Sequence, residues 1–382
     1  MEAGWRRRFR APGITVPQWG IHDPDHLVYG SNADGKWEIY AWDRRAGAHR
    51  QVTDRSEGTS PGHIDSAGRL VWWFDDERGR ELGRWMVEPF GGGSPEPAVP
   101  ELAPAYPAGL ALGDELAIVG SAADGSFRVH RVRPREAPAA IYEHARGARV
   151  GDLSADEELF LLSHSEHGDS RNRALRILDL EGATVAELWD GRGKGLHLGR
   201  WSPVPGDRRV VVGHEREGPI RPLLWHPQRR EVTELAIDLP GEILDGGWYP
   251  DGSALLLQHY WQGRGELYRY ELGPGRAERL EIGRGIAGGA QVRPDGEIWY
   301  GFSSSASPPE VRTGSRILLR PPGEPAPCGV AYRDLWAGEV HAFVAEPPSP
   351  RPHATVFRVH GGPEGMDADS FSPAVQAWVD HG

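Results

Sequence analysis

Two short stretches, "PDGSALLLQ" (residues 250–258) and "PDGEIWYGF" (residues 294–302), follow the same pattern. Each begins with an Asp-Gly turn and continues as an apolar run that favours a β-strand. Five looser copies occur earlier in the chain: "DPDHLVYG" (23–30), "SAGRLVWWF" (66–74), "LGDELAIVG" (112–120), "SADEELFLLS" (154–163) and "PGDRRVVVGH" (205–214). A turn followed by a strand therefore recurs seven times, and such a repeat decides the fold.

Each copy is followed by a polar loop and a second strand, for example "WEIYAWD" (37–43), "ALRILDL" (174–180) or "ELYRYEL" (266–272). A third short strand often comes next, as in "HRQVT" (49–53) or "VAELW" (185–189). Three visible strands and a less obvious fourth, in units of ~40–45 residues, are the size of a β-propeller blade. The strands of a β-sandwich are not expected to repeat one sequence pattern seven times. The pattern predicts an all-β, seven-bladed propeller over residues 1–314, and Ser and Pro enrichment indicates a linker over 315–330.

Composition narrows the classes of function. The net charge of −12 over 382 residues argues against a nucleic-acid partner, which needs clustered Lys and Arg. The basic run Arg6–Arg10 is interpreted as a solvated terminal segment. One cysteine, Cys328, excludes an intramolecular disulfide and a cysteine-based zinc site. Neither a leader pattern nor an 18-residue apolar run occurs, so we expect a cytoplasmic protein without membrane contact. No cofactor is expected, and the sequence leaves the oligomeric state open.

The last part of the chain, residues 331–382, has a different pattern. Strands are predicted over 329–334 and 339–345, and a buried strand over 354–359 leads directly into His360-Gly361-Gly362-Pro363. A helix follows, with a cap at Ser372, Pro373 in its first turn and Gly382 at its end. Its apolar stripe of Val375, Trp378 and Val379 is expected to lie against a sheet.

The tail after seven blades resembles the entry to the catalytic domain of prolyl oligopeptidase-family serine peptidases, most closely the acylaminoacyl-peptidase and dipeptidyl-peptidase-like branch. These proteins combine a seven-bladed propeller with an α/β-hydrolase domain. The resemblance implies that residues 331–382 are the first strands and helix of that domain. It also implies that the Gly362 N–H donates to the oxyanion of acyl transfer, while His360, Gly361 and Pro363 shape the loop.

In hydrolases of this fold the nucleophile, the acid and the histidine all follow the oxyanion loop. The residues after Pro363 include Ser370, Ser372, Asp380 and His381, but none sits on a strand-to-helix elbow. The triad is therefore expected to be absent from these 382 residues. A G-x-S-x-G match around Ser60 (58–62) lacks the strand before and the helix after that an elbow needs, so we interpret it as coincidental.

Three other segments carry weaker signals. His164, Glu166 and His167 have a metal-like spacing but lie in a predicted hairpin loop, where such side chains are usually solvated, so no metal is expected. The glycine-rich segment 191–199 lacks the phosphate-loop pattern. Glu215 and Glu217 lie in a loop that could reach the propeller mouth, where some relatives hold a peptide's amino end.

The sequence thus predicts the propeller and oxyanion-loop portion of a serine peptidase that cleaves short, possibly N-acylated peptides through an acyl-enzyme. By themselves these residues are expected to be inactive. Two alternatives stay open: a non-catalytic TolB-like binding propeller, and a subunit completed by a separate chain. The choice between acyl-, dipeptidyl- and endo-cleavage also stays open.

Overall fold

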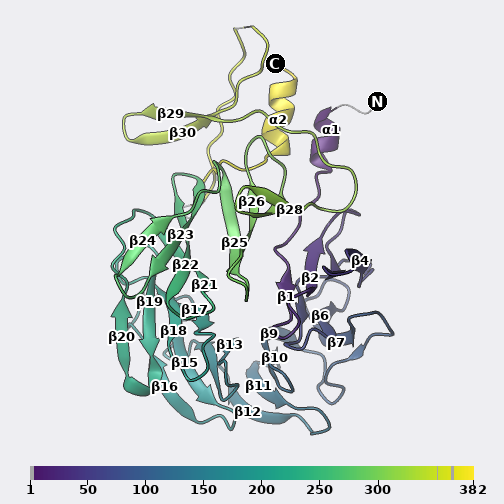
Figure 1. Ribbon diagram of the computed structural model, residues 1–382, viewed down its shortest axis with the longest axis vertical. Helices are drawn as coiled ribbons and strands as arrows, with labels where there is room; N and C mark the ends of the chain where they lie inside the picture. The colour runs from purple at the N-terminus through teal and green to yellow at the C-terminus, as the bar shows by residue number, and fades with distance from the viewer. Residues whose placement is uncertain (1–3, 351, 363–364) are drawn as a thin grey trace.

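The structure is a computed structural model that describes residues 4–350, 352–362 and 365–382. Seven four-stranded antiparallel units follow one another along the chain and are arranged in a ring (Figure 1). Blade 1 consists of β1 (Gln18–Trp19), β2 (His26–Ser31), β3 (Glu38–Asp43) and β4 (Ala48–Gln51), and blade 2 of β5 (Gly62–Ile64), β6 (Leu70–Asp76), β7 (Gly83–Pro89) and β8 (Glu96–Pro97). Blade 3 consists of β9 (Tyr106–Leu112), β10 (Ala117–Ala123), β11 (Ser126–Val132) and β12 (Ala139–His144), and blade 4 of β13 (Ala148–Leu153), β14 (Leu159–His164), β15 (Ala174–Asp179) and β16 (Thr184–Leu188).

The second half of the ring has the same order. Blade 5 consists of β17 (Leu196–Trp201), β18 (Val210–His214), β19 (Arg221–His226) and β20 (Glu231–Glu234), with a 3₁₀ turn (Pro227–Arg229) before its last strand. Blade 6 consists of β21 (Glu242–Trp248), β22 (Ala254–Trp261), β23 (Arg264–Glu271) and β24 (Arg276–Arg279), and blade 7 of β25 (Ile286–Val292), β26 (Ile298–Ser303), β27 (Glu310–Thr313) and β28 (Arg316–Leu319). The predicted seven-bladed β-propeller is confirmed.

The innermost strand of each blade is the one that the repeat pattern missed. In five blades its pairing with the second strand shifts register, and several of these strands contain glycine. Gly109 in β9 shows why, because its φ is +93° and a Cβ there would lie 2.2 Å from the Val150 carbonyl oxygen of the next blade. The innermost strands converge on the channel, where neighbouring blades come close together. The glycines and bulges that permit this approach interrupt the alternation of apolar and polar residues by which a strand is recognised in a sequence.

The core lies between neighbouring blades. Leu161 and Ile177 of blade 4, for example, pack against Val210 and Trp225 of blade 5, and all four are almost fully buried. Blades 2 and 3 meet in the same way around Trp72. Each repeat therefore buries its apolar face only when the next repeat stacks on it, which explains why the strands are apolar on both faces.

The ring is closed by side chains. Within the described residues, no strand of blade 7 pairs with a strand of blade 1. Instead the buried Arg293 lies 4.1 Å from the Trp299 ring and 5.0 Å from the Trp19 ring, and it donates to the Pro24 carbonyl at 2.9 Å. Trp299 also stacks on Trp42 of blade 1.

Both ends of the predicted propeller domain need correction. The last blade continues to Leu319, past the boundary predicted at Gly314, because Leu318 and Leu319 pack on the Trp299 cluster. Helix α1 (Gly4–Phe9) lies next to the C-terminal helix rather than in a blade (Figure 1). Arg8 is not solvated as predicted, since it bonds the Asp380 carboxylate and the Cys328 carbonyl.

The tail contains one hairpin, β29 (Arg333–Ala337) with β30 (Val340–Val344), and helix α2 (Pro373–Asp380). The strand predicted over 329–334 starts later than expected, because Val330 bonds the Gln376 side chain instead. The buried strand predicted over 354–359 is wrong: this segment is irregular, and the Phe357 side chain is 85% exposed. A strand needs a neighbour to satisfy its backbone, and no described residue pairs with this segment.

Neither helix in the described part of the chain is long and apolar enough to cross a membrane.

Candidate functional site

The predicted oxyanion loop lies in an exposed segment. His360, Gly361 and Gly362 are all exposed. Gly362 has a φ of +70°, and among the described residues, its chain neighbours aside, nothing lies within 4 Å of where a Cβ would be. Pro363, the fourth member of the predicted loop, lies outside the described residues. The left-handed conformation at Gly362 suits glycine and leaves the space around its backbone open to a ligand.

Helix α2 follows this loop. A serine caps its N-terminus, and a buried glutamine attaches it to blade 7. Ser372 caps it by accepting from the Val375 N–H at 3.4 Å, as predicted. The buried face differs from the predicted stripe: Val379 is buried, but Trp378 is 64% exposed and its place is taken by Gln376. Gln376 is buried because its amide donates to the carbonyls of Ser305 and Val330, which joins the helix to blade 7.

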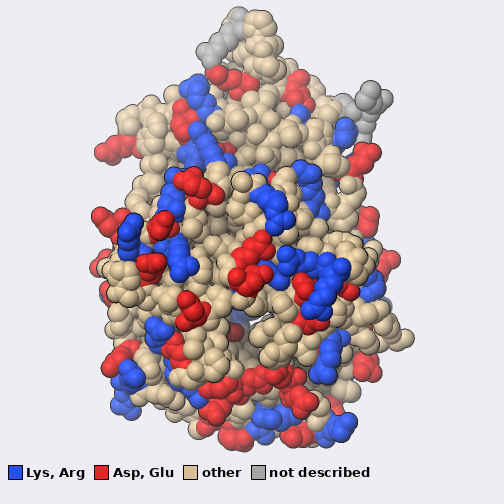
Figure 2. Space-filling view, viewed as in Figure 1, with Lys and Arg blue, Asp and Glu red and all other residues tan. Residues whose placement is uncertain are grey.

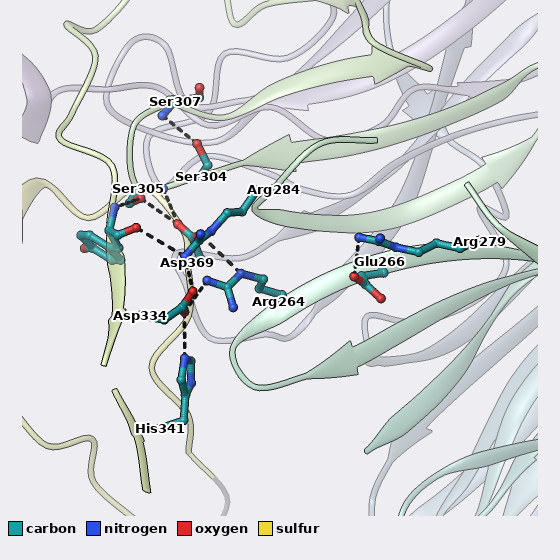
Figure 3. A network of polar contacts seen from close by, with 11 residues as sticks. Arg264, Glu266, Arg279, Arg284, Ser304, Ser305, Ser307, Asp334, His341 and Asp369 are labelled. Atoms are coloured by element: carbon teal, nitrogen blue, oxygen red, sulfur yellow. Dashed lines mark hydrogen bonds and ion pairs between the residues drawn. The ribbon is translucent and has the colours of Figure 1, made fainter. Parts of the chain in front are cut away.

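A buried carboxylate, Asp369, anchors the segment between loop and helix (Figure 3). Its Oδ1 accepts from the Ser305 N–H at 3.1 Å and the Ser305 hydroxyl at 2.7 Å. Its Oδ2 lies 3.3 Å from Arg284 Nε and 3.7 Å from Arg264 Nε. The Asp369 N–H also donates to the Gly263 carbonyl at 2.8 Å. All of these partners belong to blades 6 and 7 or to the connection between them, so the tail is docked on two blades.

A second carboxylate connects the same arginines to the hairpin (Figure 3). Asp334 on β29 accepts from Arg264 at 2.6 Å, from Arg284 at 2.7 Å and from the His341 ring at 2.9 Å. Partial burial raises the pKa of Asp334, but the hydrogen bonds from Arg264 and His341 outweigh it and bring the pKa to about 2. Asp334 is therefore ionised near neutral pH, where its charge faces the two arginines.

The polar residues after the loop have separate structural partners. Ser372 caps α2, Asp380 pairs with Arg8, and the His381 ring bonds the Ala377 carbonyl at 2.7 Å. Ser60 is exposed between β4 and β5, with no helix beside it. The structure therefore does not bring Ser60 and the tail residues together.

A channel of about 730 Å³ runs through the centre of the ring, and a hollow opens near the middle of the face in Figure 2. Asp152, Arg200 and Asp245 lie on its wall, on adjacent innermost strands. Burial raises the pKa of Asp245 to about 6, against the opposing charge of Arg200. Burial raises the pKa of Asp152 as well. No sequence pattern pointed to these residues, because they lie on the innermost strands, which the repeat pattern did not identify.

The three segments with weaker sequence signals have different surroundings in the structure. Glu166 pairs with Arg176, while the rings of His164 and His167 both face Glu187 of the neighbouring strand β16. Glu215 bonds the His197 ring at 2.8 Å on the channel side, whereas Glu217 is exposed. Segment 191–199 is a loop that runs into β17 without a helix, so it does not form a phosphate-binding turn.

These features define a class of fold: a seven-bladed propeller with a C-terminal extension docked on its last two blades. No protein-family model matches the sequence, and no curated protein matches it. A solved structure of a prolyl endopeptidase, from work on inter-domain dynamics in the catalysis and specificity of two such enzymes, is similar with a TM-score of 0.75 and 13% identity. The match covers 99% of this chain and 61% of that one, so the chain spans about three fifths of the enzyme's length. The two proteins share a fold.

Proposed function

We propose that residues 1–382 form the propeller and the oxyanion-loop portion of a prolyl oligopeptidase-family serine peptidase that acts on short peptides. The observation that carries the proposal is the order of parts: seven blades, then His360-Gly361-Gly362-Pro363, then a capped helix. The fold shared with a prolyl endopeptidase along 99% of this chain supports it.

The docking of the tail supports the same proposal. Asp369 and Gln376 attach the residues just after the loop to blades 6 and 7. Positioning of this kind is what an oxyanion donor needs, because a backbone N–H stabilises developing charge only when it is held in place beforehand. The donor in the proposal is the Gly362 N–H.

Exposed apolar side chains on the tail also fit a catalytic domain. The exposed side chains are Leu335, Trp336, Val340, Val356, Phe357, Val359, Met366 and Trp378. Large apolar side chains exposed to water on one segment of a protein often mark an interface. In the proposal the rest of the hydrolase domain covers these side chains.

The channel limits the substrate in this proposal. At about 730 Å³ it has room for a short peptide but not for a folded protein. Cleavage of short peptides, including N-acylated ones, is therefore the activity proposed for the complete catalytic unit. The 382 residues by themselves are proposed to be inactive, since an oxyanion donor without a nucleophile has nothing to stabilise.

The test joins residues 1–382 to the nucleophile-, aspartate- and histidine-bearing segment of a related peptidase and measures kcat and KM on an N-acyl-peptide. We expect residues 1–382 alone to show no turnover and the joined protein to be active. Gly362→Pro removes the proposed donor and should lower kcat by ~100–1000-fold, or roughly 3–4 kcal/mol, with a much smaller change in KM.

Two matched variants complete the experiment. Gly91→Ala changes an exposed glycine between β7 and β8, where nothing among the described residues lies within 4 Å of the added carbon, and Ser60→Ala removes the coincidental motif. Both should stay within a few-fold of the parent, and thermal melting must show that Gly362→Pro is folded. A folded Gly362→Pro protein with the kcat of the parent would refute the oxyanion assignment. Ester hydrolysis by residues 1–382 that Ser60→Ala abolishes would refute the proposed function.

A further inference from the structure

Blade 4 carries a cluster of two histidines and a glutamate far from the tail. His164 ends β14, His167 lies in the loop that follows, and Glu187 lies on β16. His167 Nε2 is 2.7 Å from Glu187 Oε1, and His164 Nε2 is 3.5 Å from Glu187 Oε2. The three ligand atoms all lie within 4.8 Å of one another.

His164 is the unusual member of the cluster. Its side chain has no exposed surface, and its Nε2 makes no hydrogen bond with any described residue. A buried ring nitrogen without a partner is costly, so such an atom points to a ligand that the protein is built to take. From the sequence, His164 was predicted to lie in a solvated hairpin loop, which argued against a metal-binding role. Because His164 is buried, that argument no longer applies to it.

Comparison with the neighbouring blades sharpens this observation. Histidines recur at the same strand position in blades 5 and 6, as His214 and His259, each four residues before a glycine as His164 is. In blade 6 the His259 Nε2 bonds the Pro240 carbonyl at 2.6 Å, so that ring has an ordinary structural role. In blade 4 the equivalent nitrogen faces Glu187 and His167 instead.

The loop that presents His167 is held in place. Asp169 accepts from the backbone N–H groups of Asn172 at 3.0 Å and Gly193 at 3.2 Å, which ties the loop to the segment after β16. The His167 ring stacks on Trp189 with centroids 4.0 Å apart and planes at 7°. Preorganised ligands bind an ion more tightly because less entropy is lost on binding.

A second layer surrounds the cluster. His164 Nδ1, the other ring nitrogen, accepts from the Glu166 N–H at 3.4 Å and lies 3.9 Å from Glu166 Oε1. Glu166 itself accepts from the Tyr142 hydroxyl at 2.7 Å and from Arg176 at 2.7 and 2.9 Å. When His164 Nε2 binds a metal, Nδ1 carries the proton and can donate it to the Glu166 carboxylate, which is the usual outer partner of a ligating histidine. Arg176 also pairs with Glu187, so two carboxylates face one arginine and leave net negative charge for a cation.

We propose that His164 Nε2, His167 Nε2 and the Glu187 carboxylate bind one zinc ion in blade 4. Two imidazoles and a carboxylate are a common zinc ligand set, at bond lengths of about 2.0–2.2 Å. The ion takes the place of the hydrogen bond between His167 and Glu187 and supplies the partner that His164 lacks. The fourth position is left to water, beside the half-exposed Trp189. The ion links β14, its loop and β16, and thereby stabilises the outer part of the blade.

The experiment measures zinc binding to metal-free residues 1–382 by titration calorimetry, with thermal melting and the visible spectrum of bound Co²⁺ as further readouts. We expect one Zn²⁺ per chain, a higher melting temperature that a chelator reverses, and a tetrahedral Co²⁺ spectrum. His167→Ala and Glu187→Gln should each weaken binding at least tenfold. His164→Gln is the third variant, and melting without metal shows whether it is folded.

The matched control is His197→Ala. His197 and Glu215 form another His–Glu pair at 2.8 Å in the next blade, and no third ligand lies beside them among the described residues. Its removal should leave zinc binding unchanged. The proposal fails if wild-type protein binds no Zn²⁺ at micromolar concentration, or if folded His167→Ala and Glu187→Gln bind it as tightly as the parent does. Loss of binding in His197→Ala alone would place the ion elsewhere and would equally refute the site.

Discussion

At the scale of single residues, the channel wall holds acids that the fold does not fully neutralise. Asp245 accepts from the Gly247 N–H at 2.6 Å, but the opposing charge of Arg200 acts on Asp152 as well. The arginine lowers the pKa of Asp245 less than burial raises it, so the pKa is about 6. An acid whose pKa is raised on folding costs stability whenever it is ionised.

Asp245→Asn is therefore expected to stabilise the protein at high pH. Between the unfolded pKa of about 4 and the folded pKa of about 6, the native state binds more protons, so the wild-type free energy of unfolding falls as pH rises. The asparagine can still accept the Gly247 N–H. We expect a gain of about 1–3 kcal/mol near pH 8 and none near pH 4, measured by urea unfolding at both pH values. An equal gain at both would show that the ionisation of Asp245 is not the cause.

At the scale of elements, helix α2 was predicted correctly as a helix, but the face that it buries was predicted wrongly. The cap at Ser372 and the end at Gly382, where φ is +86°, were predictable from local chemistry. The buried face was not, because Gln376 finds two carbonyls and a backbone N–H in blade 7 and its junction with the tail. A satisfied polar side chain can displace an apolar one from an interface, leaving Trp378 exposed.

Asp369→Asn is expected to loosen this element. The asparagine keeps the size of the side chain but removes the charge that faces Arg264 and Arg284, which costs about 2–4 kcal/mol of docking free energy. In limited chymotrypsin digestion we expect wild-type protein to be cut first after the exposed Phe357, and the variant to gain an early cut after Phe371.

Glu324→Gln is the matched control for this digestion, since Glu324 is 90% exposed and its pair with Arg7 is 3.7 Å long. Its fragments should match those of the wild type. Identical fragments from Asp369→Asn and wild type would mean that the carboxylate does not hold the tail.

At the scale of the whole molecule, the ring depends on contacts at one seam. Neighbouring blades elsewhere follow one another along the chain, but blades 1 and 7 are joined by Arg293 between two indole rings. The Nε and Nη1 atoms of Arg293 make no hydrogen bond with described residues, so its charge is only partly compensated. We infer that Arg293 stabilises the seam mainly by filling the space between the rings.

Arg293→Ala is expected to lower the free energy of unfolding by about 2–4 kcal/mol, through the cavity and the lost contact with Pro24. Arg293→Met refills much of the space without a buried charge and should cost less than half as much. Arg316→Ala, at a side chain that is 64% exposed, should change the value by no more than about 0.5 kcal/mol. Urea unfolding measures all three. A larger loss for methionine than for alanine would contradict the packing explanation.

The sequence alone determined the parts of this protein that repeat. Turn chemistry and apolar runs near Asp251 and Asp295 were enough to predict seven blades, because the signal of each strand is local and the copies reinforce one another. The cap of α2 was equally local. Tertiary structure decided the rest: the innermost strands around Gly109, the docking of Asp369, the irregular path of residues 354–359 and the burial of His164. Each of these depends on residues far apart in the chain, and a short-range pattern carries no information about which distant partner satisfies a backbone or a charge.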